Sequence, residues 1–484
     1  MDQNKLSRAI ALHKAHDFDS ARALYDEVIL NDDSHHLPLF LLGALEIDLL
    51  NYTSAIKYLK LSLEKNPNHQ ETYLNLGTVY YELKDYNNCK KYYEKGNEIN
   101  QFNYNLLMNL AGVYEDTGEF NKAISLYQKV YDNDPEDLKV AFFLYQFKAL
   151  KLDKDFKKKI KLILKNKSSS YKNKLYANML LSKYANKLSL HKDELKHLLN
   201  LHSIVYDRNK KYFEIKNNFL FDELRNIGKY YDSSSIIKTD KKLSSSIQPI
   251  FIISLPRSGS TLLEKLIAYN QKNLISGEEV GVFSIIGKEF QEDKNFNSKF
   301  NEIANGIINK YQEIGLISKK EKFNFIDKSV DNVYFVGWIK SIFPKAKFIN
   351  CTRDPKASIV SILRNVFGNL SWAHTIKDIA KYIDNHYYLI DYWQKEHQIE
   401  IYNLKYENLI NNFEEESKKL MDYCSLKWSK DIVHFNTSSK FITRTASNVE
   451  VRKPIYKTID RSYESLAGLF ENDLKKYKWS NYSW

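Results

Sequence analysis

A 34-residue spacing of small and large residues runs through the first 136 residues. One position of each unit is small, a position four residues later is large, and a position twelve residues earlier is again small. The three sets are Ala21, Ala55, Cys89 and Ala123; Tyr25, Leu59, Tyr93 and Tyr127; and Ala9, Gly43, Gly77 and Ala111. Small residues let two antiparallel helices cross closely, while large ones fill the space between neighbouring units. The spacing therefore predicts an all-α solenoid of four helix pairs over residues 1–136.

The repeated unit resembles the tetratricopeptide repeat, because four units keep one register and Pro67 and Pro135 close two of them. Helical patterns continue over residues 137–231, where the spacing degenerates, and we interpret them as further degenerate helical repeats. The stretch 232–248 is rich in serine and lysine, which is typical of a linker. A second domain is therefore expected over residues 249–484.

The second domain alternates apolar, β-like runs with helical patterns. The runs occur at residues 250–255, 323–326, 346–351 and 399–404. This alternation predicts an α/β domain with a mainly parallel sheet. Because ligands of such sheets bind at the carboxyl ends of the strands, the residues directly after the runs are the best candidates for a functional site.

The first of these strand ends has the features of an anion site. A small-residue turn leads from the apolar run into a helical pattern, so backbone N–H groups and the positive end of the helix dipole converge there. The turn consists of Arg257, Ser258, Gly259, Ser260 and Thr261. The ATP-binding signature GxxxxGK[ST] is absent, because no lysine precedes the hydroxyl residues, and this disfavours a P-loop kinase or ATPase.

A second candidate anion site follows the run at 346–351. Arg353 alone could be a surface arginine paired with Asp354, but Pro355 fits the first turn of a helix, and Ser358 lies near the start of that helix. A guanidinium and a hydroxyl in this position could hold a phosphate by charge-assisted hydrogen bonds. Two such sites at neighbouring strand ends predict a ligand with two separated phosphate-like groups.

Taken together, the strand ends resemble the motifs of a known enzyme family. LPRSGSTLL is similar to the 5′-phosphosulfate loop of sulfotransferases, and CTRDPKASIVS is similar to their 3′-phosphate motif. ISGEEVGVF, FIDKSVDNVY, LKYENLI and TRTASNVEVRKPIY fall in the order expected for tetratricopeptide-repeat sulfotransferases, relatives of the protein-tyrosine sulfotransferases. The resemblance covers residues 249 to about 465. It implies a P-loop-like sulfotransferase domain that uses 3′-phosphoadenosine 5′-phosphosulfate, PAPS, as sulfuryl donor.

The resemblance also implies which residues bind the donor. The turn from Arg257 to Thr261 would hold the 5′ end of PAPS, with Ser260 in place of the family's usual threonine. The remaining implied contacts are Arg353 and Ser358 on the 3′-phosphate, Tyr406 beside the adenine, and Lys453 near the donor.

Sulfuryl transfer is an in-line displacement, in which the protein positions the reactants and neutralises charge on the equatorial and leaving oxygens. Lys328 and Arg257 are the cations expected at the transferring sulfonate and the leaving phosphate. Ser447, six residues before Lys453, matches a serine that stabilises the same transition state in the tyrosine sulfotransferases.

The acceptor hydroxyl also needs a base. By its position, Glu279 matches the glutamate that supplies the base in the tyrosine sulfotransferases, while many repeat-bearing relatives have a single glutamate after the glycine, which leaves Glu278 open. Glycine followed by two glutamates is also an ordinary solvated turn. His374 is a weaker candidate for the base, because histidine serves this role in other sulfotransferase branches.

Composition narrows the class of protein further. The formal charge of +12 would suit an anionic partner, but lysine is spread along the chain, so we expect only a local positive field and no nucleic-acid partner. The three cysteines form no CxxC and no His/Cys cluster, which favours a reducing compartment without disulfides or metal. The sequence shows neither a signal peptide nor a transmembrane run, and we expect a cytoplasmic protein.

The leading hypothesis is a PAPS-dependent sulfotransferase that acts on a hydroxyl of a peptide tyrosine, a sugar or a small alcohol. Concave repeat surfaces usually bind extended chains, which favours a peptide or oligosaccharide acceptor, or a protein partner, on the repeats. The alternative is a repeat scaffold whose second domain binds nucleotide without catalysis. Intact Arg257, Glu279 and Lys328 argue against this alternative.

Overall fold

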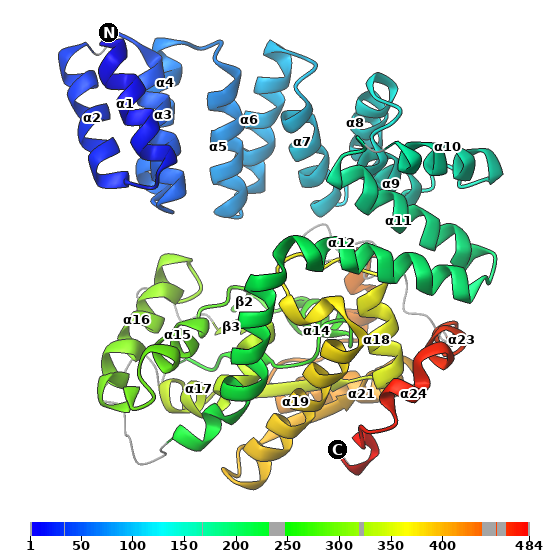
Figure 1. The fold of residues 1–484 in the computed structure, drawn as a ribbon. Helices are drawn as coiled ribbons and strands as arrows, with labels where there is room; N and C mark the ends of the chain where they lie inside the picture. Colours follow the sequence, from blue (N-terminus) through cyan, green and yellow to red (C-terminus); the bar gives the residue numbers. More distant parts are fainter. Residues whose placement is uncertain are drawn as a thin grey trace. The chain divides into compact units, whose positions relative to one another are not determined.

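The computed structural model describes residues 2–32, 34–166, 168–231, 247–318, 324–437, 452 and 461–482. The chain divides into two compact units, unit 1 (Met1–Lys151) and unit 2 (Leu152–Trp484). Unit 1 is built from helices, whereas unit 2 holds a β-sheet surrounded by helices (Figure 1).

Unit 1 is a row of helix pairs in which the predicted four-pair solenoid is confirmed (Figure 1). Each 34-residue repeat supplies two helices that pack against each other, and each pair packs against the next. The helices are α1 (Gln3–Lys14), α2 (Phe18–Asn31), α3 (His36–Asp48), α4 (Tyr52–Lys65), α5 (Gln70–Glu82), α6 (Tyr86–Ile99), α7 (Tyr104–Asp116) and α8 (Phe120–Asn133), followed by α9 (Leu138–Gln146).

The small residues of the repeat lie where its two helices cross. A Cβ added to Gly43 would lie 2.7 Å from Leu59 Cγ, and one added to Gly77 would lie 2.3 Å from the ring of Tyr93, so glycine is needed for the close approach. Leu59 also joins a cluster with Leu76 of the next repeat, as a residue that fills the space between units should. The sequence spacing thus corresponds to direct packing contacts.

The sheet of unit 2 has five parallel strands, in the order β2-β3-β1-β4-β5, which confirms the predicted mainly parallel sheet. The four predicted runs correspond to β1 (Ile250–Ile252), β3 (Asn324–Asp327), β4 (Lys347–Thr352) and β5 (Ile401–Lys405). The sequence analysis missed the edge strand β2 (Leu274–Ser276), because three half-buried residues are too few to form a recognisable pattern. β1 lies between β3 and β4, so the loops after these three strands emerge side by side.

Helices cover both faces of the sheet. The helices that follow β1 along the chain are α14 (Ser260–Ala268), α15 (Ser284–Glu292), α16 (Phe300–Glu313), α17 (Val336–Ile342), α18 (Pro355–Leu363), α19 (Ile376–Lys395), α20 (Tyr406–Asn411), α21 (Phe413–Tyr423), α23 (Tyr463–Ala467) and α24 (Glu471–Leu474). Because side chains alternate along a strand, Ile250 and Ile252 of β1 pack with α14, α20 and α21, while Phe251 stacks with aromatic rings on the other face. The loops at the strand ends therefore start from a rigid core.

Unit 2 also includes α10 (Lys154–Lys165), α11 (Tyr171–Lys187) and α12 (His191–Asn218). Along α12, His202 Nε2 donates to Leu363 O at 2.9 Å, and Glu194 forms an ion pair of 2.8 Å with Arg364, both at the end of α18. The predicted domain limits at residues 136, 231 and 248 stay predictions. Most of the predicted linker, residues 232–246, lies outside the described residues.

Candidate active site

The turn after β1 contains two residues in the left-handed region. Arg257 has φ +66° and Gly259, the N-cap of α14, has φ +108°. A Cβ on Gly259 would lie 2.7 Å from the ring of Tyr406, so only glycine fits without a shift. Ser258 is fully buried, and its hydroxyl donates to Leu255 O at 2.6 Å. The turn is thus a fixed, tightly packed start to α14, with Ser260 and Thr261 as the first two residues of the helix.

The two predicted anion motifs meet beside this turn. Arg257 Nε donates to Ser361 Oγ of α18 at 3.0 Å, and Arg353 Nη1 donates to Arg257 O at 3.3 Å. The guanidinium of Arg353 lies over the ring of Tyr406, with its central carbon 5.1 Å from the ring centroid. The ends of β1, β4 and β5 therefore bring Arg257, Arg353 and Tyr406 together.

The start of α18 carries a buried serine hydroxyl. Asp354 caps the helix by accepting from Ala357 N at 2.9 Å, and Pro355 occupies the first turn, as the sequence predicted. Ser358 is fully buried, and its Oγ has no hydrogen-bond partner among the described residues. Because a buried hydroxyl without a partner is costly, this atom is suited to a ligand group that accepts a hydrogen bond.

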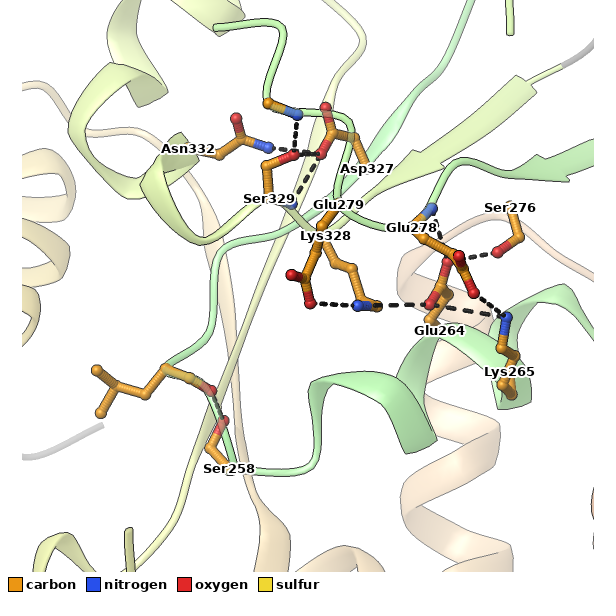
Figure 2. A network of polar contacts seen from close by, with 12 residues as sticks. Ser258, Glu264, Lys265, Ser276, Glu278, Glu279, Asp327, Lys328, Ser329 and Asn332 are labelled. Atoms are coloured by element: carbon orange, nitrogen blue, oxygen red, sulfur yellow. Dashed lines mark hydrogen bonds and ion pairs between the residues drawn. The ribbon is translucent and has the colours of Figure 1, made fainter. Parts of the chain in front are cut away.

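A network of alternating charges lies on the other side of β1 (Figure 2). Lys328, at the end of β3, is 3% exposed, and its Nζ lies 2.7 Å from Glu279 Oε1 and 4.0 Å from Glu264 Oε2. Lys265 Nζ lies 3.9 Å from Glu264 Oε2 and 3.3 Å from Glu278 Oε1. The five side chains form a continuous chain of ion pairs from Glu279 to Glu278.

The two adjacent glutamates face different lysines because of the conformation of the turn directly after β2, which is hydrogen-bonded to the end of β3. Gly277 N–H donates to Ile326 O at 2.8 Å, and Lys328 N–H donates to Glu278 O at 2.9 Å, which ties the turn to β3. Glu278 has φ +58°, a left-handed conformation that costs energy for a residue with a side chain. As a result, the Glu279 side chain is 54% exposed beside Lys328, whereas that of Glu278 is only 13% exposed beside Lys265.

Asp327 fixes the loop that carries Lys328 (Figure 2). Its buried carboxylate accepts from Ser329 N at 2.8 Å, Ser329 Oγ at 2.6 Å, Asn332 Nδ2 at 3.0 Å and Tyr311 Oη at 2.6 Å. Burial raises the pKa of Asp327, and these hydrogen bonds oppose the rise. Ser329 Oγ in turn accepts from Gly281 N at 2.7 Å, which joins this loop to the segment that follows Glu279.

His374 lies in a packed interface within unit 2. Its Nδ1 is 3.1 Å from His202 Nδ1, its ring stacks on Phe213 with centroids 5.2 Å apart, and the residue is 3% exposed. Burial lowers the pKa of His374 to about 4, and the neighbouring His202 adds to this effect. The ring of His374 is therefore closed off from solvent by its neighbours in unit 2. Ser447 and Lys453 lie outside the described residues.

Two comparisons with known sequences bear on this site. Residues 249–430 match the profile of the family described as "Sulfotransferase family", and residues 70–103 and 104–137 match that of the tetratricopeptide repeat. The chain carries a sulfotransferase-family domain behind tetratricopeptide repeats. This confirms the resemblance that the strand-end motifs and the 34-residue spacing indicated.

The individual proteins to which the chain is similar share little sequence identity with it. A protein of Aquifex aeolicus (strain VF5), described as an uncharacterized protein, is 28% identical over 228 residues, which are 44% of this chain and 30% of that protein. Among solved structures, the sulfotransferase domain from the curacin biosynthetic pathway is 18% identical, with a match that covers 48% of this chain and 93% of its own and a TM-score of 0.31. The pilF protein of Pseudomonas aeruginosa is 13% identical, with coverages of 44% and 96% and a TM-score of 0.34.

Several features of the sulfotransferase-family domain fit a donor with two anionic ends. The β1 turn offers backbone N–H groups at a helix start, Arg353 offers a guanidinium, and Ser358 offers a buried hydroxyl without a partner. Gly259 lets the ring of Tyr406 pack directly against the backbone of the turn. Among the described residues, no group of three or more His, Cys, Asp or Glu side chains could hold a metal ion, and no helix is long and apolar enough to cross a membrane.

The sequence analysis overlooked two residues of the site, Glu264 and Asp327. Asp327 ends an apolar run and directly precedes the lysine of the predicted DKS motif, so its place at a strand end was a usable signal. Glu264 gave no such signal, because a Glu-Lys pair within a helix usually lies on a solvated face. In the structure Glu264 is fully buried between two lysines.

Proposed function

We propose that this protein transfers the sulfuryl group of PAPS to an acceptor hydroxyl. The observation that carries the proposal is the pair formed by Lys328 and Glu279, a buried cation and a half-exposed carboxylate 2.7 Å apart. The two candidate anion sites, at the β1 turn and at the start of α18, follow the neighbouring strands β1 and β4. A reaction that moves an anionic group onto a hydroxyl needs this combination, because one group must neutralise charge and another must accept a proton.

The residues of the two candidate anion sites would bind the donor. The turn from Arg257 to Thr261 would hold its 5′ end, and Arg353 and Ser358 would hold its 3′-phosphate, with Tyr406 beside the base. Ser258 donates its hydroxyl to Leu255 O, so a contact of this hydroxyl with the donor would require it to rotate. PAPS, when bound, supplies a sulfuryl group on a good phosphate leaving group.

Glu279 would act as the base, and Lys328 and Arg257 as the cations. The acceptor oxygen forms its bond to sulfur while the bond from sulfur to the phosphate oxygen breaks, and adenosine 3′,5′-bisphosphate leaves. Glu279 takes the proton of the acceptor hydroxyl, and Lys328 stabilises the charge on the sulfonate oxygens. Glu278 pairs with Lys265 instead, so Glu279 is the better placed of the two glutamates.

We also propose that the repeats of unit 1 bind the acceptor or a partner that delivers it. The repeats suit a peptide or oligosaccharide that carries the hydroxyl, or a protein partner that delivers it. A cytoplasmic site of action agrees with the cysteine content of the chain, because its three cysteines are buried and show no CxxC spacing.

Mass spectrometry of a lysate or glycan pool incubated with PAPS and the protein tests the proposal. We expect products that gain one SO₃, and we expect the Arg257→Ala and Lys328→Ala variants to form none while they remain folded. Undiminished transfer by either variant would overturn the residue assignments. Donor binding without any sulfated product would favour the scaffold alternative.

A further inference from the structure

Glu264 is a buried carboxylate at the centre of the charge network (Figure 2). It sits in α14, one turn after the anion-binding turn, and is 0% exposed. A buried carboxylate is costly unless hydrogen bonds and opposite charges compensate for its lost hydration. Here both kinds of compensation come from residues of the candidate site.

The two oxygens of Glu264 have different contacts. Oε1 accepts a hydrogen bond from the hydroxyl of Ser276, at the end of β2, and another from the backbone N–H of Glu278 at 3.0 Å. Oε2 accepts no hydrogen bond from any residue that the structure describes, and it lies 3.9 Å from Lys265 Nζ and 4.0 Å from Lys328 Nζ. One oxygen therefore holds the turn that carries Glu278 and Glu279, and the other provides negative charge to two ammonium groups.

Lys328 thus has two carboxylate partners that differ in what the reaction does to them. Glu279 is half-exposed and, as the base, loses its negative charge when it takes the acceptor proton. Glu264 is sealed from solvent and takes no part in proton transfer, so its charge persists. Without this second partner, a 3% exposed ammonium would have no adjacent ionised carboxylate of the protein once Glu279 has taken the proton.

We propose that Glu264 is a positioning residue of the reaction, which keeps Lys328 cationic after Glu279 becomes neutral and holds the Glu278–Glu279 turn in register with β3. The inference rests on the proposed function, since it assigns Glu264 a role in the same sulfuryl transfer.

The electrostatics of Lys328 agree with this role. Burial acts to lower the pKa of Lys328, but three carboxylates outweigh it and raise the pKa above its usual value, Glu264 first, then Glu279 and Glu278. The charge of Glu264 raises the pKa of Lys328 although its oxygen is farther away than that of Glu279, because little water screens this buried pair, whereas Glu279 acts through both its charge and its hydrogen bond. The charged groups that face Lys328 come from α14 and from the turn after β2.

Glu264→Gln removes the charge and keeps an oxygen that can accept both hydrogen bonds. We expect wild-type transfer to persist into the alkaline range, because the carboxylates around Lys328 raise its pKa. In the variant, an alkaline loss of kcat should appear at least about one pH unit lower, since one opposite charge is worth about one to three pKa units. The 15N chemical shift of the Lys328 side chain, followed by NMR across the same pH range, should show the same shift without any reliance on activity.

Two further variants serve as controls for Glu264→Gln. Glu264→Asp keeps the charge, so its alkaline limb should lie closer to that of the wild type; this variant also serves if the glutamine variant does not fold. Glu194→Gln, which removes another buried carboxylate of unit 2, should leave the profile unchanged. A uniform rate loss with an unshifted limb and an unshifted NMR titration of Lys328 would overturn the inference, whereas absence of transfer in the wild type would overturn only the proposed function.

Discussion

The two sides of the β1 turn are built for different tasks. On the β4 side, Arg353 stacks on Tyr406 and the hydroxyl of Ser358 has no partner, so the site offers donors to a charge that comes from outside. On the β3 side, Lys328 is already paired, and three carboxylates and two lysines compensate one another. A permanent anion needs only fixed donors, whereas a proton that moves needs a base whose neighbours tolerate its change of charge. The variants below test whether these two tasks are separate.

Lys328→Ala should have the largest effect, because it removes the buried cation nearest to Glu279. We expect kcat to fall by about three orders of magnitude or more, in the upper range for loss of a charge-stabilising donor. Binding of adenosine 3′,5′-bisphosphate, measured by calorimetry, should weaken far less, since the β4 side is intact. Wild-type turnover in a folded Lys328→Ala protein would break the distinction between the two sides.

Glu279→Gln should come next. Loss of a general base lowers kcat by about a hundredfold to ten-thousandfold, and the neutral amide keeps the shape of the side chain. Glu278→Gln should lower kcat by no more than about tenfold, because this carboxylate pairs with Lys265 and not with Lys328. Steady-state kinetics of the two variants decide between the glutamates, and the reverse order of effects would assign the base to Glu278.

Ser358→Ala should act on the donor and not on the chemical step. Loss of a hydrogen bond to a charged group costs about 1.5–3 kcal/mol, so the Kd of adenosine 3′,5′-bisphosphate should rise by about ten- to a hundredfold. At saturating donor, kcat should stay within about threefold of the wild type, because the network around Lys328 is untouched. An unchanged Kd would mean that the buried hydroxyl does not contact the ligand.

Ser260→Thr should have the smallest effect. The substitution restores the threonine that is usual in sulfotransferases and keeps the hydroxyl at the first residue of α14. We expect donor affinity and kcat to stay within about threefold of the wild type, as is usual for a change that adds only one methyl group at a partly exposed position. A larger loss in the same assays would show that this position is more crowded than its partial exposure indicates.

The sequence predicted the parts of the molecule that have a pattern. The 34-residue spacing located the helix pairs, and alternating apolar runs placed Arg257, Lys328 and Arg353 at one edge of a parallel sheet. Glu264 could not be predicted, because its burial depends on β2, a three-residue strand, and on the turn after it. The different orientations of Glu278 and Glu279 depend on a left-handed φ at Glu278. The sequence gives no hint of this conformation, because it is expected mainly at glycine and asparagine and not at glutamate. The roles of Ser447 and Lys453 stay predictions.

The most direct test of the separation between the two sides is to measure donor Kd and saturated kcat in Ser358→Ala and Glu279→Gln side by side. We expect Ser358→Ala to raise the Kd and to leave kcat nearly unchanged, and Glu279→Gln to lower kcat at least about a hundredfold and to leave the Kd nearly unchanged. If both variants changed the same parameter, one common site would do both tasks, and the proposed division between a donor side and a proton side would be wrong.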